Sequence, residues 1–240
     1  MCQRLIILLF FLIPFISQAG TVEVNIGHFD GSGVIVRKEV ESFYELRQKN
    51  VVLQRSDFSC GAASMATVFN YYLDEPILEQ EVVQETLKLS KLNGTLEKII
   101  KRRGFSLLDL KMFAESYGYK VAGYRLEFED LVDLGVPAIV PIIPGGYKHF
   151  VVFRGADEKN VFLADPSFGN LIRSIEKFKK DWYGFTNVAL VVFPKKERKI
   201  DSENHPLAVT ELDKIYAGKE SVDAFRYAVP VRGPFVPTEF

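Results

Sequence analysis

The hydrophobic pattern divides the chain into a helical part followed by a strand-rich part. Between residues 59 and 117, apolar side chains recur at the spacing of an amphipathic helix, and glycines follow the apolar segments as they do at helix ends. The pattern predicts four helices, at residues 59–73, 77–89, 95–103 and 107–117, preceded by a shorter one at 42–49.

After Gly118 the hydrophobic period changes from that of a helix to the alternation of strands. Strands are expected at residues 120–126, 138–143, 149–154, 161–164, 171–174 and 188–193, with a helical turn at 129–134 and a brief extended segment at 51–54. Helices followed by strands favour an α+β domain. We therefore expect N-terminal helices packed on one face of a C-terminal antiparallel sheet.

The N-terminus has the pattern of a secretory signal peptide. The run from Leu5 to Ile16 is almost wholly apolar but too short to span a bilayer comfortably, and Ser17-Gln18-Ala19 supplies a small-x-small cleavage site. We predict that residues 1–19 are removed on export to the periplasm, which leaves no membrane span. The alternative is an uncleaved N-terminal anchor.

The mature chain is expected to have three parts. Residues 20–50 form an N-terminal extension, with a strand around 22–26 and a turn at 31–33. Residues 51–194 form the main domain, and residues 195–240 form a tail that starts with a charge run and contains one expected helix, at 208–216.

Composition limits the chemistry of the protein. The 30 Lys and Arg residues balance 31 Asp and Glu residues, which argues against a protein held to nucleic acid by bulk charge. Two Cys and three His residues are too few for a disulfide framework and a poor stock for a zinc site, so no metal or other cofactor is expected. Removal of the signal peptide leaves Cys60 as the only thiol.

Cys60 and three other residues form a candidate catalytic set. Cys60 stands at the start of a predicted helix, where unpaired backbone N–H groups favour a thiolate. His149 lies at a loop–strand junction, and Asp165 ends the next strand, so an antiparallel pairing would bring both side by side. Such an Asp fixes the imidazole tautomer. Gln54, six residues before Cys60, offers an amide that can join the Cys60 N–H as oxyanion donors.

Each of these residues also has a purely structural interpretation. Cys60 can be a packed core residue, His149 a strand-edge residue, Asp165 part of a turn with Pro166, and Gln54 a loop cap. The order and context of the four residues together favour the catalytic interpretation. The chain has no Gly-x-Ser-x-Gly elbow at its serines, which argues against a serine hydrolase.

The segment Gln54-Arg55-Ser56-Asp57-Phe58-Ser59-Cys60-Gly61-Ala62-Ala63-Ser64 resembles the active-site segment of the bacteriocin-processing, double-glycine leader peptidases, which are papain-like cysteine proteases. Residues 149–153 and 165–169 match the His and Asp motifs of that family, and the resemblance covers residues 51–193. It implies a papain-like fold and a cysteine endopeptidase with Cys60 as nucleophile, His149 as base and acid, Asp165 as orienter and Gln54 as oxyanion donor.

The chain departs from the usual member of that family, which is fused to transporter helices and an ATPase domain and faces the cytosol. With its expected export signal, it resembles the stand-alone periplasmic members found with functional-amyloid secretion systems. The implied partners are a secreted polypeptide substrate and secretion-system components. Two alternatives remain: a peptidase-like module that holds a secretion substrate without cutting it, and an amidase or acyltransferase acting on cell-wall peptide.

Overall fold

A computed structural model of the chain describes residues 20–26, 34–40, 42–184, 187–195, 204–211 and 213–214. The chain forms two compact units, residues 1–46 and residues 47–240. The expected signal peptide, residues 1–19, and most of the expected tail lie outside the described residues. Among the described helices, none is long and apolar enough to cross a membrane.

The first unit contains an antiparallel hairpin. Strand β1, Gly20–Ile26, pairs with β2, Val34–Val40, in a register that places Gly20 opposite Val40. The strand expected at 22–26 is confirmed, whereas the second strand was not expected. Helix α1, Phe43–Gln48, begins in this unit and confirms the short helix expected at 42–49. The expected turn at 31–33 lies outside the described residues.

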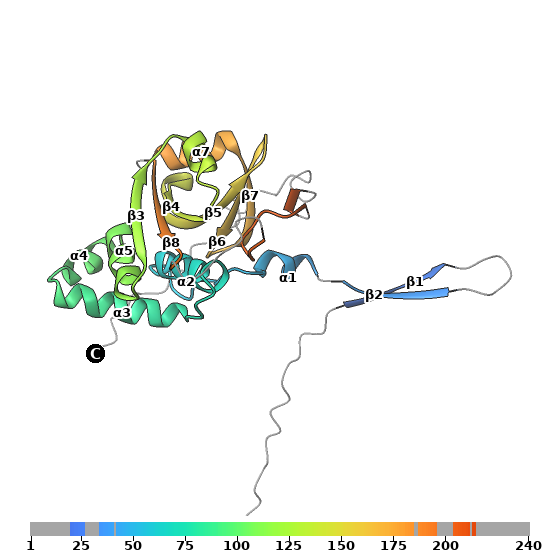
Figure 1. Cartoon of the computed structure of the whole chain (residues 1–240), viewed down its shortest axis with the longest axis horizontal. Coiled ribbons are helices and arrows are strands. Elements are labelled where there is room, and N and C mark those ends of the chain that lie inside the picture. Colours follow the sequence, from blue (N-terminus) through green and yellow to red (C-terminus); the bar gives the residue numbers. More distant parts are fainter. Residues whose placement is uncertain are drawn as a thin grey trace, which may run out of the picture. The chain divides into compact units, whose positions relative to one another are not determined.

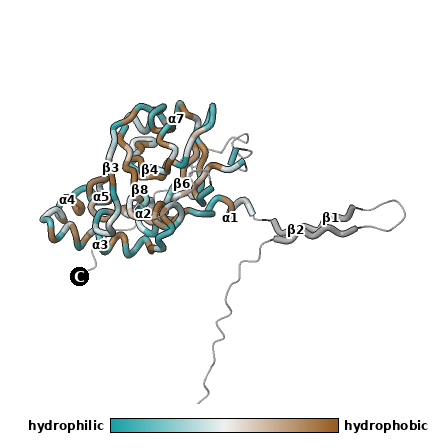
Figure 2. The backbone as a smooth tube through the Cα atoms, viewed as in Figure 1, coloured by the Kyte–Doolittle hydropathy of each residue, from teal (hydrophilic) through white to brown (hydrophobic). Residues whose placement is uncertain are grey.

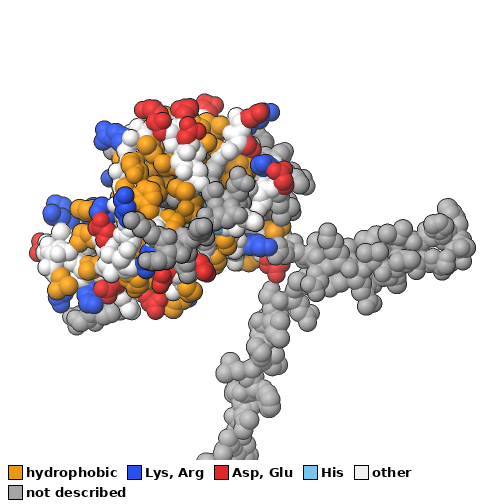
Figure 3. Space-filling view, in the orientation of Figure 1, with side chains coloured by type: hydrophobic (Ala, Val, Ile, Leu, Met, Phe, Trp, Pro, Cys, Tyr) orange, Lys and Arg blue, Asp and Glu red, His pale blue; other side chains and the backbone are white. Residues whose placement is uncertain are grey.

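Unit two begins with the helices that the hydrophobic spacing predicts. They are α2 Cys60–Tyr71, α3 Glu79–Leu92, α4 Leu96–Arg102 and α5 Leu107–Ser116, followed after one strand by α6 Phe128–Asp133. All five are confirmed to within a few residues at each end. Helix α4 buries only Ile99. On the face drawn in Figure 3, basic side chains lie in small separate groups, one of them on the side where α4 stands.

Helix α7, Ile175–Tyr183, was not expected. The Ser174 hydroxyl caps it by accepting the backbone N–H of Lys177 at 3.3 Å. Two residues one helical turn apart, Phe178 and Trp182, are fully buried and pack on the sheet side. The sequence contains both the start signal, Ser174, and the apolar spacing of Phe178 and Trp182, but charged residues stand between the signal and the apolar pair.

The described strands of the second unit form one antiparallel sheet with the order β3-β8-β4-β5-β6-β7. Their bounds are β3 Lys120–Arg125, β4 Ala138–Ile142, β5 His149–Ala156, β6 Asn160–Asp165, β7 Gly169–Ser174 and β8 Val188–Phe193. Each expected strand is confirmed, although the extended segment expected at 51–54 pairs with no strand. Figure 1 shows the helices α2, α3 and α5 beside the sheet and α7 beyond it.

Hydrophobic cores lie on both faces of this sheet. Along β5, Val152 belongs to the core that α2 and α5 share, whereas Val151 and Phe153 belong to the core that α6 and α7 share. Figure 2 shows hydrophobic positions concentrated where the central strands lie between the helices. The N-terminal helices therefore pack on an antiparallel sheet as expected, and a second helical layer covers the other face.

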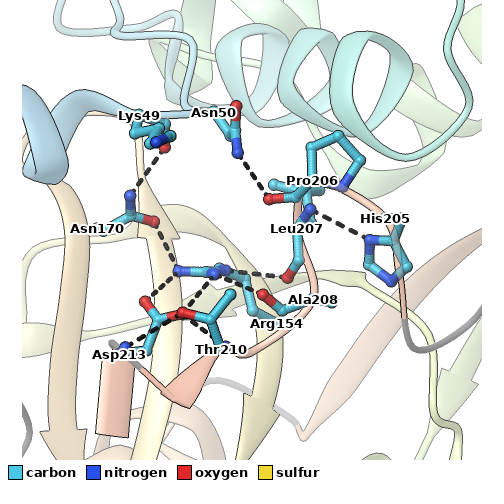
Figure 4. A network of polar contacts seen from close by, with 10 residues as sticks. All are labelled: Lys49, Asn50, Arg154, Asn170, His205, Pro206, Leu207, Ala208, Thr210 and Asp213. Carbon is cyan, nitrogen blue, oxygen red and sulfur yellow. Dashed lines mark hydrogen bonds and ion pairs between the residues drawn. The ribbon is translucent and has the colours of Figure 1, made fainter. Parts of the chain in front are cut away.

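Within the second unit, the C-terminal segment, residues 204–211 and 213–214, packs against strand β5 through Arg154 (Figure 4). All five guanidinium N–H groups of Arg154 donate: to the carbonyls of Leu207 and Ala208, to the Asn170 side chain, and twice to the Asp213 carboxylate. Leu207 is fully buried in the core of α2 and α5. Of the helix expected at 208–216, residues 211, 213 and 214 are helical, and residues 212, 215 and 216 lie outside the described part.

Candidate active site

Cys60 is the first residue of α2 and is 8% exposed. Ser59, which precedes it, does not cap the helix, because its hydroxyl instead donates to the Ser56 carbonyl at 2.9 Å and accepts the Ser56 N–H at 3.2 Å. The first N–H groups of a helix have no partner within the helix. The N-terminal turn of α2 therefore keeps uncapped donors next to Cys60, in a position where the helix dipole favours an anion.

Small residues bring the start of α2 against β5. A Cβ atom at Gly61 would lie 3.2 Å from side-chain atoms of Leu110 and Phe150, so a larger residue there would force the neighbours to move. One turn along the helix, Ser64 donates its hydroxyl to the Phe150 carbonyl at 3.3 Å. These contacts hold the Cys60 end of α2 beside Phe150, the residue that follows His149.

His149 and Asp165 form a buried pair. His149 Nε2 lies 2.8 Å from Asp165 Oδ1, and the two residues are 3% and 0% exposed. They come from β5 and β6, which pair antiparallel, so the expected juxtaposition is confirmed. Asp165 Oδ1 also accepts the backbone N–H of Ser167 at 2.7 Å, whereas His149 Nδ1 has no hydrogen-bond partner among the described residues.

The charge around His149 favours its protonated form. Burial alone lowers the pKa of this imidazole, but the Asp165 carboxylate and its hydrogen bond outweigh burial, and Cys60 adds to the same effect. The pKa of His149 is raised from 6.5 to about 10. Since Nε2 is taken by Asp165, Nδ1 is the ring nitrogen left for a proton exchanged with the thiol.

Gln54 is held against the turn that carries Asp165. Its backbone N–H donates to the Pro166 carbonyl at 2.8 Å, and its side-chain Oε1 accepts the Ser167 hydroxyl at 3.0 Å. The amide Nε2 donates to the Ser56 carbonyl at 3.0 Å. An amide NH2 group has two N–H donors. One N–H of Gln54 is therefore used inside the loop, and the other is left for a ligand.

Tyr147 is a residue of the candidate site that sequence reasoning missed. The 3₁₀ turn Pro144–Gly146 precedes it, and its hydroxyl donates to the Asp57 carbonyl at 3.1 Å. Burial and the charges of Cys60 and Asp57 raise the pKa of Tyr147. Its ring centroid lies 6.1 Å from that of His149, so Tyr147 bridges the loops that precede Cys60 and His149.

Among the described residues, no three His, Cys, Asp and Glu side chains gather as ligands of a metal ion would. The charged groups of the site are instead one imidazole and one carboxylate beside a thiol at a helix start. A thiol, an imidazole oriented by a carboxylate, and uncapped N–H donors are the groups that cysteine-dependent acyl transfer uses.

Residues 48–197 match the model of the Peptidase C39 family, and the chain belongs to this family of cysteine peptidases. The expected resemblance and the papain-like α+β class are thereby confirmed.

Individual relatives are similar over much of the chain. The probable functional amyloid protease FapD of Pseudomonas aeruginosa is 37% identical over 182 residues, which are 76% of this chain and 77% of that protein. The protein of the same name from Pseudomonas fluorescens is 36% identical over 66% of this chain and 68% of its own. A solved double glycine motif protease from an AMS/PCAT transporter, in complex with the leader peptide, is 27% identical and covers 62% of this chain and 96% of its own, with a TM-score of 0.49.

Proposed function

We propose that the protein is an exported cysteine endopeptidase that cleaves a secreted polypeptide, with Cys60 as its nucleophile. The observation that carries the proposal is the buried pair of His149 and Asp165, 2.8 Å apart, next to a thiol at the uncapped start of α2. Membership of the Peptidase C39 family supports the reaction type, and the proposal adds the residue roles, the endopeptidase specificity and the compartment.

In the proposed reaction, the thiol proton of Cys60 already lies on His149 when the sulfur attacks the scissile carbonyl carbon. The raised pKa of His149 favours this imidazolium. The Cys60 N–H and the free N–H of Gln54 bind the oxyanion of the tetrahedral intermediate. The C–N bond then breaks as His149 gives its proton to the leaving amine. Water, deprotonated by His149, hydrolyses the thioester and restores the thiol.

Export and the substrate class belong to the same proposal. The apolar run and the small-x-small site at residues 17–19 support removal of residues 1–19 and release into the periplasm. Two relatives named as probable functional amyloid proteases support a substrate that is secreted by an amyloid system, together with contacts to components of that system. Fractionation of the native host and sequencing of the mature N-terminus test the export: we expect Gly20 in the periplasmic fraction.

The test of the activity compares the mature wild-type chain with Cys60→Ala. Each is incubated with the exported proteins of the host, and new N-termini are identified by mass spectrometry. We expect new internal N-termini with the wild type alone, which distinguishes an endopeptidase from a peptidase that trims chain ends.

Three results would contradict the proposal in different ways. Binding of a secreted polypeptide by both proteins without any new N-terminus would identify a non-cleaving binding module. New N-termini that persist in Cys60→Ala would remove Cys60 as nucleophile. Release of fragments from cell-wall peptide, with all proteins intact, would identify an amidase instead.

A further inference from the structure

The turn that carries Asp165 is joined to the segment that leads to Gln54 at several points. Arg47 donates to the Phe168 carbonyl at 2.8 Å, and Asn170 donates its amide to the Lys49 carbonyl at 2.8 Å. Gly169, with φ near 81°, lies so close that a Cβ atom would overlap the Arg47 carbonyl oxygen. The backbone of residues 47–54 and the turn 165–170 are therefore packed as one body.

Within this body, Ser167 is bonded to both functional side chains. Its backbone N–H donates to Asp165 Oδ1 at 2.7 Å, and its hydroxyl donates to Gln54 Oε1 at 3.0 Å. Asp165 is fully buried and orients the imidazole, while Gln54 supplies the side-chain donor of the proposed oxyanion site. One residue thus contacts the group that orients the base and the group that binds the oxyanion.

We propose that Ser167 is a positioning residue whose hydroxyl fixes the Gln54 amide for oxyanion binding. The inference rests on the proposed cysteine-peptidase function and adds a residue to it. The Ser56 carbonyl takes one N–H of the amide, and an acceptor there excludes the flipped amide, which would face it with an oxygen. The Ser167 hydroxyl then holds Oε1, so that the remaining N–H keeps one direction.

The two hydrogen bonds of Ser167 can be separated by mutation. Ser167→Ala removes the hydroxyl but keeps the backbone N–H that binds Asp165, so the His149–Asp165 pair is retained. Ser167→Thr keeps a hydroxyl and is expected to restore function. A positioning role for Gln54 alone therefore predicts a change in oxyanion binding with no change in the thiol–imidazole pair.

Two small-molecule probes measure oxyanion binding and the thiol–imidazole pair separately, without a known substrate. Iodoacetamide alkylates Cys60 and forms no oxyanion, so its rate reports the thiol and His149. An N-acetyl dipeptide aldehyde ending in glycinal adds Cys60 sulfur to its carbonyl carbon, and the carbonyl oxygen takes the electron pair and then a proton. Its inhibition constant, measured by protection against alkylation, reports the oxyanion donors. Losing one hydrogen bond should weaken the aldehyde about 5- to 10-fold in Ser167→Ala.

The control experiments isolate the route through Gln54. Ser174→Ala removes another exposed serine hydroxyl, which caps α7, and should leave both probes unaffected. In a Gln54→Ala background, Ser167→Ala should weaken the aldehyde no further, because the amide that it positions is absent. We expect Ser167→Thr to bind the aldehyde within about twofold of the wild type.

Three results with the variants would overturn the inference: unchanged aldehyde binding in Ser167→Ala, an equal loss in the Gln54→Ala background, or a slower alkylation rate that tracks the loss. A wild type with no affinity for the aldehyde would refute the oxyanion site and the inference with it. If the aldehyde and alkylation results are as expected but the protein cleaves no polypeptide, the inference stands and only the hydrolytic function is rejected.

Discussion

Replacing Asp165 with Asn should lower the pKa of His149 by several units while leaving the fold in place. Asn is nearly isosteric and can keep an oxygen acceptor for the Ser167 N–H, which lies 2.7 Å from Asp165 Oδ1. It removes the carboxylate charge, which is the main reason that the pKa of His149 is raised. Burial then remains as the dominant effect, and burial disfavours the charged ring.

The size of the change follows from the two pKa values. The pKa of His149 is raised from 6.5 to about 10 in the wild type, so its ring stays protonated at neutral and mildly alkaline pH. With a pKa of about 6.5 or lower in Asp165→Asn, about 3% of the rings or fewer are protonated at pH 8. The proposed proton donor to the leaving amine is then depleted roughly 30-fold at that pH.

The same shift makes stability depend on pH. Because the folded protein binds the His149 proton more tightly than the unfolded chain, the stabilisation is fully present below the unfolded pKa of 6.5 and is lost as pH rises towards about 10. At most this is on the order of a few kcal/mol. Asp165→Asn should lack this stabilisation. Its free energy of unfolding should therefore not show the decline with rising pH that the His149–Asp165 pair causes in the wild type.

Nuclear magnetic resonance can follow the titration directly, since the chain has only three histidines. The ring signals of ¹³C-labelled histidine are recorded from pH 5 to 11, and His149 is assigned by its loss in His149→Gln. To test whether Asp165 only shapes the turn, the thermal unfolding of Asp165→Ala is compared with that of Asp165→Asn. A wild-type midpoint near 6.5, or a midpoint that Asp165→Asn leaves near 10, would refute the reasoning.

Three further predictions concern the surroundings of this pair. Cys60→Ser should lower cleavage by several orders of magnitude without changing the thermal midpoint, since serine is a far weaker nucleophile at the same position; full cleavage would reject the mechanism. Tyr147→Phe should speed alkylation of the thiol severalfold, because the bridge to the Asp57 carbonyl is lost; an unchanged rate would remove this bridge from the site. Asp213→Asn should reduce the urea-derived free energy of unfolding by about 1–3 kcal/mol at neutral pH. Burial alone raises the pKa of Asp213, but Arg154 and Thr210 outweigh burial and lower it. The difference in unfolding free energy between wild type and Asp213→Asn should therefore vanish as pH falls through that lowered pKa. A difference that persists in acid would exclude the ion pair as its cause.

The helices and strands were predictable because their signals are local. Apolar spacing and the glycines that follow α3, α4 and α5 lie within a few residues of one another, and the structure follows them closely from α2 to β8. Helix α7 was missed because its buried stripe is short: Phe178 and Trp182 lie among Lys and Glu residues and become core only against the sheet. Such tertiary packing outweighs local composition, and no single segment of sequence contains it.

The candidate site was predictable in its members but not in its supports. His149 and Asp165 could be paired from the antiparallel order of two neighbouring strands, which needs a separation of only sixteen residues. The bond from Ser167 to Gln54 joins residues 113 apart in sequence. The C-terminal segment was expected as a tail because its contacts with Arg154 span more than fifty residues and leave no periodic pattern.

Strand β5 connects the supports of the site. Its first residue, His149, pairs with Asp165, its second, Phe150, contacts the start of α2, and its sixth, Arg154, is held by the C-terminal segment. A shift of the strand along its axis would disturb all three contacts together. The position of the imidazole relative to the Cys60 thiol is therefore set by helices, turn and C-terminal segment acting on one strand, and changes far from the thiol can alter its reactivity.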